Sequence, residues 1–362
     1  MAKTYRAAAI GDTGRGGYGH GLHLPYRDME NVEFAALADP DEAGRRGAQA
    51  ATAALRTYAD YEQMLRSEEP DIVSVCPRWT DRHRELILAC LDAGCHIYSE
   101  KPMTWNLEDG DVIVATAREK GLKIAVAHQA VYLPQVQQAK ALLEKGLIGK
   151  VLAFYAHGKQ DARGGGEDMI VLGTHLFNVM RYIAGDVSWM SAHVTVGGRE
   201  LRAGDVREAA EPVGPIAGDC INSYYAFASG VSGFFDSHRY EEKPPAKRFG
   251  MEIVGSDGIL SFRNGSGENM MVYPHPVLSP AEASQKWEPL AVEDLPLQNG
   301  NQLAIVDLID AIENDRKPIS ADTDAVAALE MILGAYESQL TGRRVEMPIV
   351  NRTHPLVALV AS

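Results

Sequence analysis

Residues 5–19 read YRAAAIGDTGRGGYG, a short apolar segment that runs directly into a turn rich in glycine. The apolar part, residues 5–10, is predicted to be a buried strand because it is short, continuous and bounded by glycine. Glycines after a strand let the backbone turn tightly and approach a phosphate group, which then sits on a helix N-terminus. The stretch therefore predicts the first strand and turn of a dinucleotide-binding α/β sheet.

The glycines allow two registers for the G-x-G-x-x-G pattern of such turns. The literal pattern begins at Gly14, whereas a pattern that begins at Gly11, where the strand ends, puts Thr13 in the second position. Both registers stay open. The candidate cofactor-binding residues of this turn are Gly11, Thr13, Gly14, Arg15 and Gly16.

Asp39 follows the second predicted strand, residues 32–38, and lies 20 residues beyond Gly19. That spacing is typical of an acid that hydrogen-bonds the adenosine ribose hydroxyls. Because a carboxylate there repels a 2′-phosphate, NAD is expected rather than NADP. Arg15 and the pair Arg45-Arg46 could still reach such a phosphate and keep NADP open. A turn residue before Pro40 is the alternative interpretation of Asp39.

Strands and helices alternate up to residue 127, which predicts right-handed crossovers and a parallel sheet. The predicted strands are 71–76, 96–99 and 123–127, and the predicted helices are 83–92 and 107–120. Three residues near the turn after the third strand are further candidates for the cofactor site, with loop packing as the alternative: Pro77, Trp79 and His83.

The strand 96–99 runs into Glu100-Lys101-Pro102, at the carboxyl end of a strand, where an open α/β sheet binds its ligand. Pro102 restricts Lys101 to an extended conformation. We interpret the triplet as a rigid segment that directs the Lys101 ammonium into a cleft, where the neighbouring Glu100 carboxylate shifts the pKa of the lysine. A surface lysine that ends a strand is the alternative.

The pattern changes after residue 127, where strands separated by hairpin-type turns follow one another. We therefore expect a Rossmann domain over residues 1–127 and an α+β domain with a large, mostly antiparallel open sheet over residues 128–362. Two helices near the end, 302–315 and 322–340, could pack back on the first domain.

Composition excludes several classes of protein. The chain of 362 residues has a formal net charge of −14 and no block of basic residues, which argues against nucleic acid or an anionic membrane as a partner. Apolar runs are too short to span a membrane, and the N-terminus enters a strand without a signal-peptide pattern. The four cysteines lack metal-ligand spacing, so reduced thiols, a cytoplasmic location and no metal site are expected.

The chain resembles the Gfo/Idh/MocA family of oxidoreductases, which includes inositol dehydrogenase and glucose-fructose oxidoreductase. The matching stretches run through nearly the whole chain: the glycine turn, residues 38–40, 71–75, 93–102, 147–151, 173–182 and 253–258. Their order and spacing are specific to the family but not to one substrate.

The resemblance implies that Lys101 lies beside the substrate hydroxyl and the nicotinamide, and that His175 is the acid/base on that hydroxyl. The family motif is Asp-x-x-x-His, but Val171 stands where the aspartate should be, and Asn178 replaces a frequent acid. Asp168 and Glu167, at the start of the same helix, are candidate replacements, with a helix-capping role as the alternative for Asp168. Further residues expected in the substrate or cofactor site are Glu100, Gln129, Asp161 and Arg163.

The expected activity is NAD-dependent hydride transfer to or from a secondary hydroxyl of a sugar, glycoside or cyclitol. One alternative is a glycoside lyase or glycosidase in which NAD oxidises the ring only transiently, and another is a non-catalytic protein that senses NAD or a sugar. A homodimer or homotetramer is expected, because a large sheet with one face uncovered by helices needs a partner to bury that face.

Overall fold

The computed structural model describes residues 3–240, 249–263, 269–276, 282 and 284–361. Its contacts divide the chain into two compact units. The first unit comprises residues 1–127, 211–214 and 298–326, and the second comprises residues 128–210, 215–297 and 327–362. The first unit therefore contains the C-terminal helix α8 (Asn299–Glu313) as well as the N-terminal segment.

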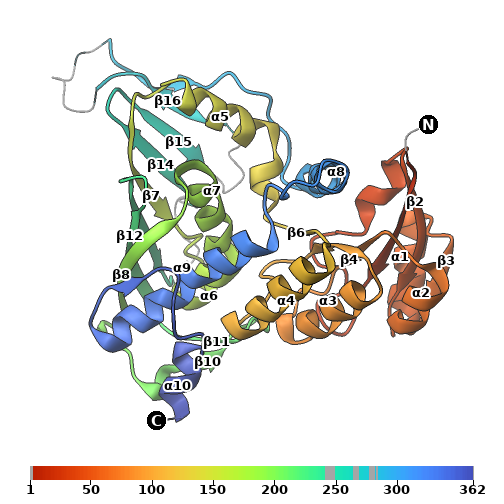
Figure 1. Ribbon diagram of the computed structural model, residues 1–362. Helices are drawn as coiled ribbons and strands as arrows, with labels where there is room; N and C mark the ends of the chain where they lie inside the picture. Colours follow the sequence, from red (N-terminus) through yellow and green to blue (C-terminus); the bar gives the residue numbers. More distant parts are fainter. Residues whose placement is uncertain (1–2, 241–248, 264–268, 277–281, 283, 362) are drawn as a thin grey trace. The chain divides into compact units, whose positions relative to one another are not determined.

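The first unit is built on a parallel sheet whose strands run in the order β3-β2-β1-β4-β5-β6 among the described residues (Figure 1). The strands are β1 (Tyr5–Ile10), β2 (Val32–Ala38), β3 (Arg56–Tyr58), β4 (Ile72–Val75), β5 (His96–Ser99) and β6 (Ile124–Val126). The connecting helices are α1 (Glu42–Thr52), α2 (Tyr61–Glu68), α3 (His83–Asp92) and α4 (Leu107–Lys120). The central strands β1 and β4 are almost wholly buried, as expected for a sheet covered on both faces.

The segment between β1 and β2 differs from the expectation of a helix directly after the glycine turn. Turns follow β1, and the helical element there is the short 3₁₀ helix η1 (Leu24–Asp28). Gly16, Gly17, Gly19 and Gly21 all have positive φ angles, between 58° and 85°, which a right-handed helix cannot contain. The prediction of a helix directly after this turn is therefore wrong, and the position of the cofactor phosphates stays a prediction.

The second unit is built on a mixed, mostly antiparallel sheet, in which β7 and β13 form the parallel pair. In the described residues its strand order is β17-β16-β15-β14-β7-β13-β12-β8-β18, and β9 pairs with β8. The central strands are β7 (Val151–His157), β8 (Val187–Val196), β12 (Cys220–Phe227), β13 (Ser232–His238), β14 (Gly250–Gly255) and β15 (Ile259–Arg263). The shorter ones are β9 (Arg199–Glu200), β16 (Met271–Tyr273), β17 (Glu288–Pro289) and β18 (Val345–Glu346).

Burial alternates along β12 and β13, so the sheet has one core face and one more exposed face. Helix α7 (Thr174–Ala184) packs on the core face, where the ring of Phe177 contacts those of Tyr225 and Phe235. Helix α9 (Asp322–Thr341) joins it there, since the Tyr225 hydroxyl donates to the carbonyl of Met331 at 3.1 Å. The predicted fold class, a Rossmann domain followed by an α+β domain with a large open sheet, is confirmed.

The second unit contains several further, mostly short elements. They are η3 (Gln129–Tyr132), α5 (Pro134–Glu144), the short α6 (Gly166–Asp168), the π-helical turn η4 (Met169–Gly173), η5 (Ala203–Asp205), β10 (Arg207–Glu208), β11 (Pro215–Ile216) and α10 (Pro355–Ala361). The first unit also contains η2 (Thr80–Arg82). The helical segment from Gly166 to Ala184 is not one regular α-helix, because the π-helical turn η4 separates α6 from α7.

Candidate active site and cofactor site

A pocket of about 230 Å³ lies in the first unit at the carboxyl ends of β1 and β2. Apolar side chains and carboxylates share its lining, which comprises Ile10, Gly11, Asp12, Ala38, Asp39, Pro40, Ala59, Asp60, Tyr61, Arg82 and Leu86. Its position at the carboxyl edge of a parallel sheet is where such folds bind their ligands. Gly11 and Asp39, both predicted from the sequence, lie in this lining.

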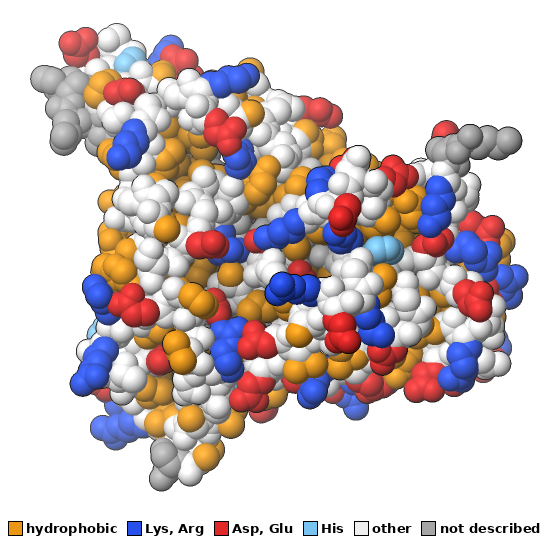
Figure 2. Space-filling model, viewed as in Figure 1, with side chains coloured by type: hydrophobic (Ala, Val, Ile, Leu, Met, Phe, Trp, Pro, Cys, Tyr) orange, Lys and Arg blue, Asp and Glu red, His pale blue; other side chains and the backbone are white. Residues whose placement is uncertain are grey.

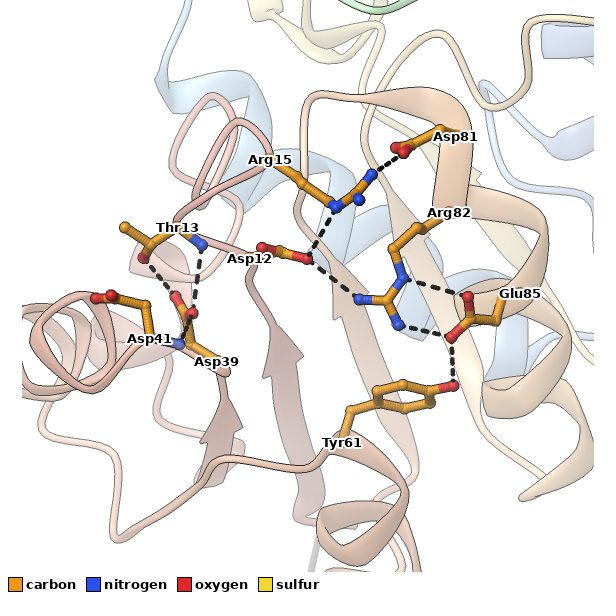
Figure 3. A network of polar contacts seen from close by, with 9 residues as sticks. All are labelled: Asp12, Thr13, Arg15, Asp39, Asp41, Tyr61, Asp81, Arg82 and Glu85. Carbon is orange, nitrogen blue, oxygen red and sulfur yellow. Dashed lines mark hydrogen bonds and ion pairs between the residues drawn. The ribbon is translucent and has the colours of Figure 1, made fainter.

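Asp39 holds the glycine turn to the end of β2 (Figure 3). Its carboxylate accepts hydrogen bonds from the Thr13 hydroxyl at 2.7 Å, from the Thr13 N–H at 3.3 Å and from the Asp41 N–H at 2.9 Å. The Asp39 side chain is fully buried by these contacts. Arg45 donates to the Asp39 carbonyl, so that guanidinium points back at its own turn.

A second group of charged side chains lies beside Thr13 and Asp39 (Figure 3). Arg82 donates to Asp12 at 3.1 Å and to Glu85 at 2.6 Å, and the Tyr61 hydroxyl donates to Glu85 at 2.8 Å. Arg15 forms ion pairs with Asp12 and Asp81. The guanidinium groups at the pocket are therefore bonded to carboxylates of the same unit, which leaves the acidic lining dominant.

Glu100 ties the glycine turn to the end of β5. Its buried carboxylate accepts the N–H of His20 at 2.7 Å and the N–H of Lys101 at 2.7 Å, and it also contacts the His20 ring. A Cβ on Gly19 would lie 2.3 Å from a Glu100 carboxylate oxygen, so only glycine fits there. Burial by itself would raise the pKa of Glu100, but the hydrogen bonds and charge of His20 and the charge of Lys101 outweigh it and hold the pKa below its usual value.

Replacing Glu100 with glutamine is expected to lower the free energy of unfolding by about 1–3 kcal/mol at neutral pH, because an amide N–H₂ would then face N–H donors inside the protein. Since the folded-state pKa of Glu100 is depressed, its stabilisation is present above the unfolded-state pKa and is lost as the pH falls through the folded-state value. Urea denaturation as a function of pH measures both effects. Glu119→Gln, at an exposed position of α4, is the control, and equal stabilities of the two variants at neutral pH would contradict the prediction.

Lys101 is almost fully buried at the carboxyl end of β5, and its peptide bond to Pro102 is cis. Of the other predicted residues, Pro77 and Trp79 lie in the turn after β4, and His83 is the first residue of α3. The Trp79 N–H points to the Arg15 carbonyl at 3.5 Å, next to the glycine turn. His83 is fully buried, with its ring nitrogens 2.7 Å from the Pro77 carbonyl and 3.0 Å from the Met103 carbonyl, so it braces this turn from inside the protein.

In the second unit, His175 and Asn178 lie buried in the first turns of α7. Gln129 is buried in η3, which packs against α7. Thr174 precedes His175 and receives a contact from the ring of His128 at 2.9 Å. The rings of His128 and His175 are perpendicular, with centroids 5.8 Å apart. This unit therefore gathers a small group of polar side chains around the start of α7.

Asp168, a candidate replacement for the acid missing at Val171, is bonded to other groups of its own unit. Its fully buried carboxylate accepts the Ser237 hydroxyl at 2.6 Å and the N–H groups of Gln160 and Lys159 at 3.0 Å and 3.2 Å. Burial raises the pKa of Asp168. These bonds make Asp168 an anchor for the loop that follows β7.

Asp161 and Arg163 pair with each other in that loop. The guanidinium of Arg163 donates to both carboxylate oxygens of Asp161, at 2.9 Å and 3.2 Å, and its N–H donates at 2.9 Å. The bonds from Arg163 lower the pKa of Asp161 to about 2. The two side chains predicted to meet a substrate separately thus form one ion pair.

Comparison with known proteins identifies the family. The model of the oxidoreductase family with an NAD-binding Rossmann fold matches residues 6–128, and its C-terminal α/β domain model matches residues 140–347. The chain belongs to the Gfo/Idh/MocA oxidoreductase family. The predicted resemblance is confirmed, and so is NAD as the cofactor class of the first domain.

Relatives within the Gfo/Idh/MocA family match along the whole chain. D-apiose dehydrogenase of Paraburkholderia graminis is 26% identical and covers 99% of this chain and 94% of its own. Scyllo-inositol 2-dehydrogenase (NAD⁺) of Bacillus subtilis is 23% identical, with 96% and 98% covered. The structure of levoglucosan dehydrogenase in complex with NADH and levoglucosan is 18% identical, covers 95% of this chain and 99% of its own, and superposes with a TM-score of 0.77, which shows a shared fold.

The pocket of the first unit fits the NAD expected of a Gfo/Idh/MocA protein. Pro40, Ala59 and Leu86 offer apolar walls of the kind an adenine ring packs against, and Asp12, Asp39 and Asp60 give the lining an acidic character suited to a ribose diol. Residues that would hold the cofactor are those of this lining together with the glycine turn.

The sequence analysis did not identify several residues of this Gfo/Idh/MocA protein that line the pocket or contact site residues. Tyr61 and Arg82 line the pocket, His20 binds Glu100, and His128 contacts Thr174. Tyr61 follows β3 by only a few residues, so the rule that ligands bind at the carboxyl ends of parallel strands would identify it only if the short β3 were recognised first. For His20 and His128 the sequence carries no local signal, because their partners are distant along the chain.

The described residues contain no group of three or more His, Cys, Asp or Glu side chains arranged to hold a metal ion. Within the same residues, no helix combines the length and apolar character needed to cross a membrane. On the face drawn in Figure 2, basic and acidic side chains of the described residues are interspersed without a continuous basic stripe.

Proposed function

We propose that this protein is an NAD-dependent dehydrogenase that transfers a hydride to or from a secondary hydroxyl of a sugar, glycoside or cyclitol. The observation that carries the proposal is the combination of an NAD-binding Rossmann unit, with Lys101 at the carboxyl end of β5, and a family C-terminal unit with His175 at the start of α7. The relatives support the substrate class, since they are dehydrogenases of apiose, scyllo-inositol and levoglucosan.

In the oxidation direction, His175 removes the proton of the substrate hydroxyl as general base, and in reduction it returns that proton. The ammonium of Lys101 hydrogen-bonds the same oxygen and stabilises the negative charge that develops on it. NAD, when bound, supplies the hydride acceptor. Asn178 and Gln129 are neutral hydrogen-bonding groups suited to orient the substrate and the nicotinamide amide.

Purified protein mixed with NAD and a panel of sugars, glycosides and polyols tests the proposal by the absorbance of the NADH formed. Net NADH formation with at least one member is expected. Consumption of a glycoside without net NADH would instead support the redox-cycling lyase or glycosidase. NAD and sugar binding without any turnover across the panel would support a sensing protein and contradict the dehydrogenase.

Asp39 is expected to set the preference for NAD over NADP. Replacing it with asparagine removes the negative charge that repels a 2′-phosphate and loosens the glycine turn that Thr13 joins to Asp39. We expect NADH affinity to fall about 10- to 100-fold, as when a charge-assisted hydrogen bond is lost, while NADPH affinity falls less or rises. Fluorescence titration with both nucleotides measures the ratio. Asp92→Asn, exposed at the end of α3, is the control, and an unchanged NADH to NADPH ratio in Asp39→Asn would contradict this role.

The more exposed face of the second unit's sheet supports assembly with a second copy of the chain. A row of rings crosses four strands there: Tyr155, Phe234, Tyr224 and Trp189, with successive centroids 4.9 Å, 5.2 Å and 5.2 Å apart. Tyr155 and Phe234 are 43% and 37% exposed, whereas α7 and α9 pack on the opposite face. A twofold axis brings the same surface patch of two copies together, so an exposed aromatic row of this kind fits a homodimer, or two such dimers in a tetramer.

Light scattering during size-exclusion chromatography tests this assembly. The unmodified protein should elute as a dimer or tetramer, and Phe234→Lys should shift it toward the monomer because a buried ammonium would face the partner's rings. Leu55→Lys, at an exposed position of the first unit, serves as the matched change and should leave the assembly intact. A monomeric unmodified protein would contradict the proposal.

A cytoplasmic location is consistent with the state of the cysteines. Cys76, Cys90, Cys95 and Cys220 are all free thiols, and the first three are buried. Burial raises the pKa of those three thiols and so keeps them in the unreactive protonated form. Free thiols persist in a reducing compartment such as the cytoplasm.

A further inference from the structure

The helix that carries His175 lacks the acid that the family motif places four residues earlier. Val171 occupies that position and is 2% exposed. It also lies in the π-helical turn η4, where hydrogen bonds span five residues instead of four, so the side chains before and after the turn are not aligned as in a regular α-helix. Two carboxylates lie just before this turn, and both are bonded elsewhere. Asp168 accepts the Ser237 hydroxyl and N–H groups of the loop after β7. Glu167 accepts the Ala210 N–H and pairs with Arg207, so neither carboxylate replaces the missing acid.

A different polar group stands beside His175. His128, just before η3, is 1% exposed, and its Nε2 lies 2.9 Å from the hydroxyl of Thr174, the residue that precedes His175 in α7. The ring of His128 is perpendicular to that of His175 at a centroid distance of 5.8 Å. Thr174 is itself buried. Two imidazoles and a hydroxyl are therefore packed together inside the second unit, where polar groups occur only when they are engaged by partners.

We propose that His128, fixed by Thr174, is the positioning residue for His175 in this chain, in the place of the absent carboxylate. The proposal rests on the acid–base role of His175 given above. The edge-to-face contact restricts the plane of the His175 imidazole, and the neighbouring ring provides a polar environment for the positive charge that His175 acquires. In that step the substrate O–H bond breaks and an N–H bond forms on His175, while His128 neither gains nor loses a proton.

The other titratable groups on elements packed against α7 have separate roles. Asp168, before η4, is bonded to Ser237, and the Tyr225 hydroxyl on β12 donates to the Met331 carbonyl. Tyr132 lies on η3, which directly follows His128. Among these side chains, His128 is the one whose ring contacts the imidazole of His175.

Two pairs of variants test the proposal. His128→Phe keeps a ring of similar shape but loses the nitrogen that meets Thr174, and Thr174→Val keeps the shape of the side chain but loses the hydroxyl. Each is expected to lower kcat about tenfold or more, because the base is then less well oriented, with an unchanged dissociation constant for NADH. His128→Gln and Thr174→Ser each restore a hydrogen-bonding group and should recover most of the lost rate.

Titration of the His175 ring by NMR gives a readout that needs no substrate. With histidine labelled at Cε1, and the His175 signal assigned from its absence in His175→Gln, the midpoint should move to lower pH by about half a unit or more in His128→Phe and Thr174→Val, because a less polar surrounding disfavours the charged imidazolium. The conservative variants should titrate near the unmodified protein.

The outcomes separate this proposal from the proposed function. If no sugar or polyol reduces NAD, the dehydrogenase fails, but a shifted His175 midpoint still supports the coupling to His128. If turnover is found and depends on His175, while His128→Phe and Thr174→Val match the unmodified protein in kcat and in the His175 midpoint, the positioning role of His128 is overturned and the dehydrogenase stands.

Discussion

Replacing Lys101 with methionine should slow hydride transfer by about 10²- to 10⁴-fold while leaving NADH binding within a few-fold of normal. The methionine side chain fills a similar volume, so the buried position at the end of β5 remains packed. What is lost is the cation that stabilises the developing alkoxide. Single-turnover measurements with saturating NAD and the best substrate of the panel give the rate of the chemical step directly.

Lys101→Arg is the matched control for charge. It keeps a cation at the position but with a planar, larger head group, and it should retain more activity than Lys101→Met without reaching the normal rate. The assigned role fails if Lys101→Met abolishes NADH binding but turns over at full rate per bound cofactor, because Lys101 would then serve the cofactor site alone.

Replacing His175 with alanine should cost a similar factor, about 10²–10⁴ in kcat, and should also change the pH dependence. Without the imidazole, the proton of the substrate hydroxyl must leave to solvent, so the residual oxidation rate should rise steadily with pH instead of levelling off above the pKa of the base. Added imidazole, which can enter the space left by the side chain, should restore part of the rate.

The contrast with Lys101→Met makes the prediction specific. In the lysine variant the levelling of the pH profile should persist, because the general base is still present. A His175→Ala variant whose pH profile has the normal shape would show that another group removes the proton, and the mechanism would then need a different base.

The fold could be predicted from the sequence where strong local signals repeat. Apolar strands such as residues 72–75, followed by helices that end at glycine, predicted the parallel sheet. Strands separated by turns after residue 150 predicted the second sheet. Strand β3 was not predicted, because its three residues, Arg56–Tyr58, are partly exposed and form no apolar run. The π-helical turn could not be predicted either, because no side-chain pattern distinguishes Met169–Gly173 from an ordinary helix.

The candidate site was predictable in part for a related reason. Asp39 and Lys101 stand at the ends of recognisable strands, so topology places them at the ligand-binding edge. The role of Asp39 in holding Thr13, and of Glu100 in holding His20, depends on contacts over 26 and 80 residues of sequence. Such pairings arise from packing and have no local signature, which is also why His128 could not be connected with Thr174.

A crystal structure of the protein with NADH and an active polyol would test the proposed roles of Lys101 and His175. We predict that the Lys101 ammonium and the His175 imidazole both lie within hydrogen-bonding distance of one substrate oxygen, with the carbon that bears it against the reactive face of the nicotinamide. A complex in which the two side chains contact different groups, or in which either one faces away from the bound polyol, would contradict it.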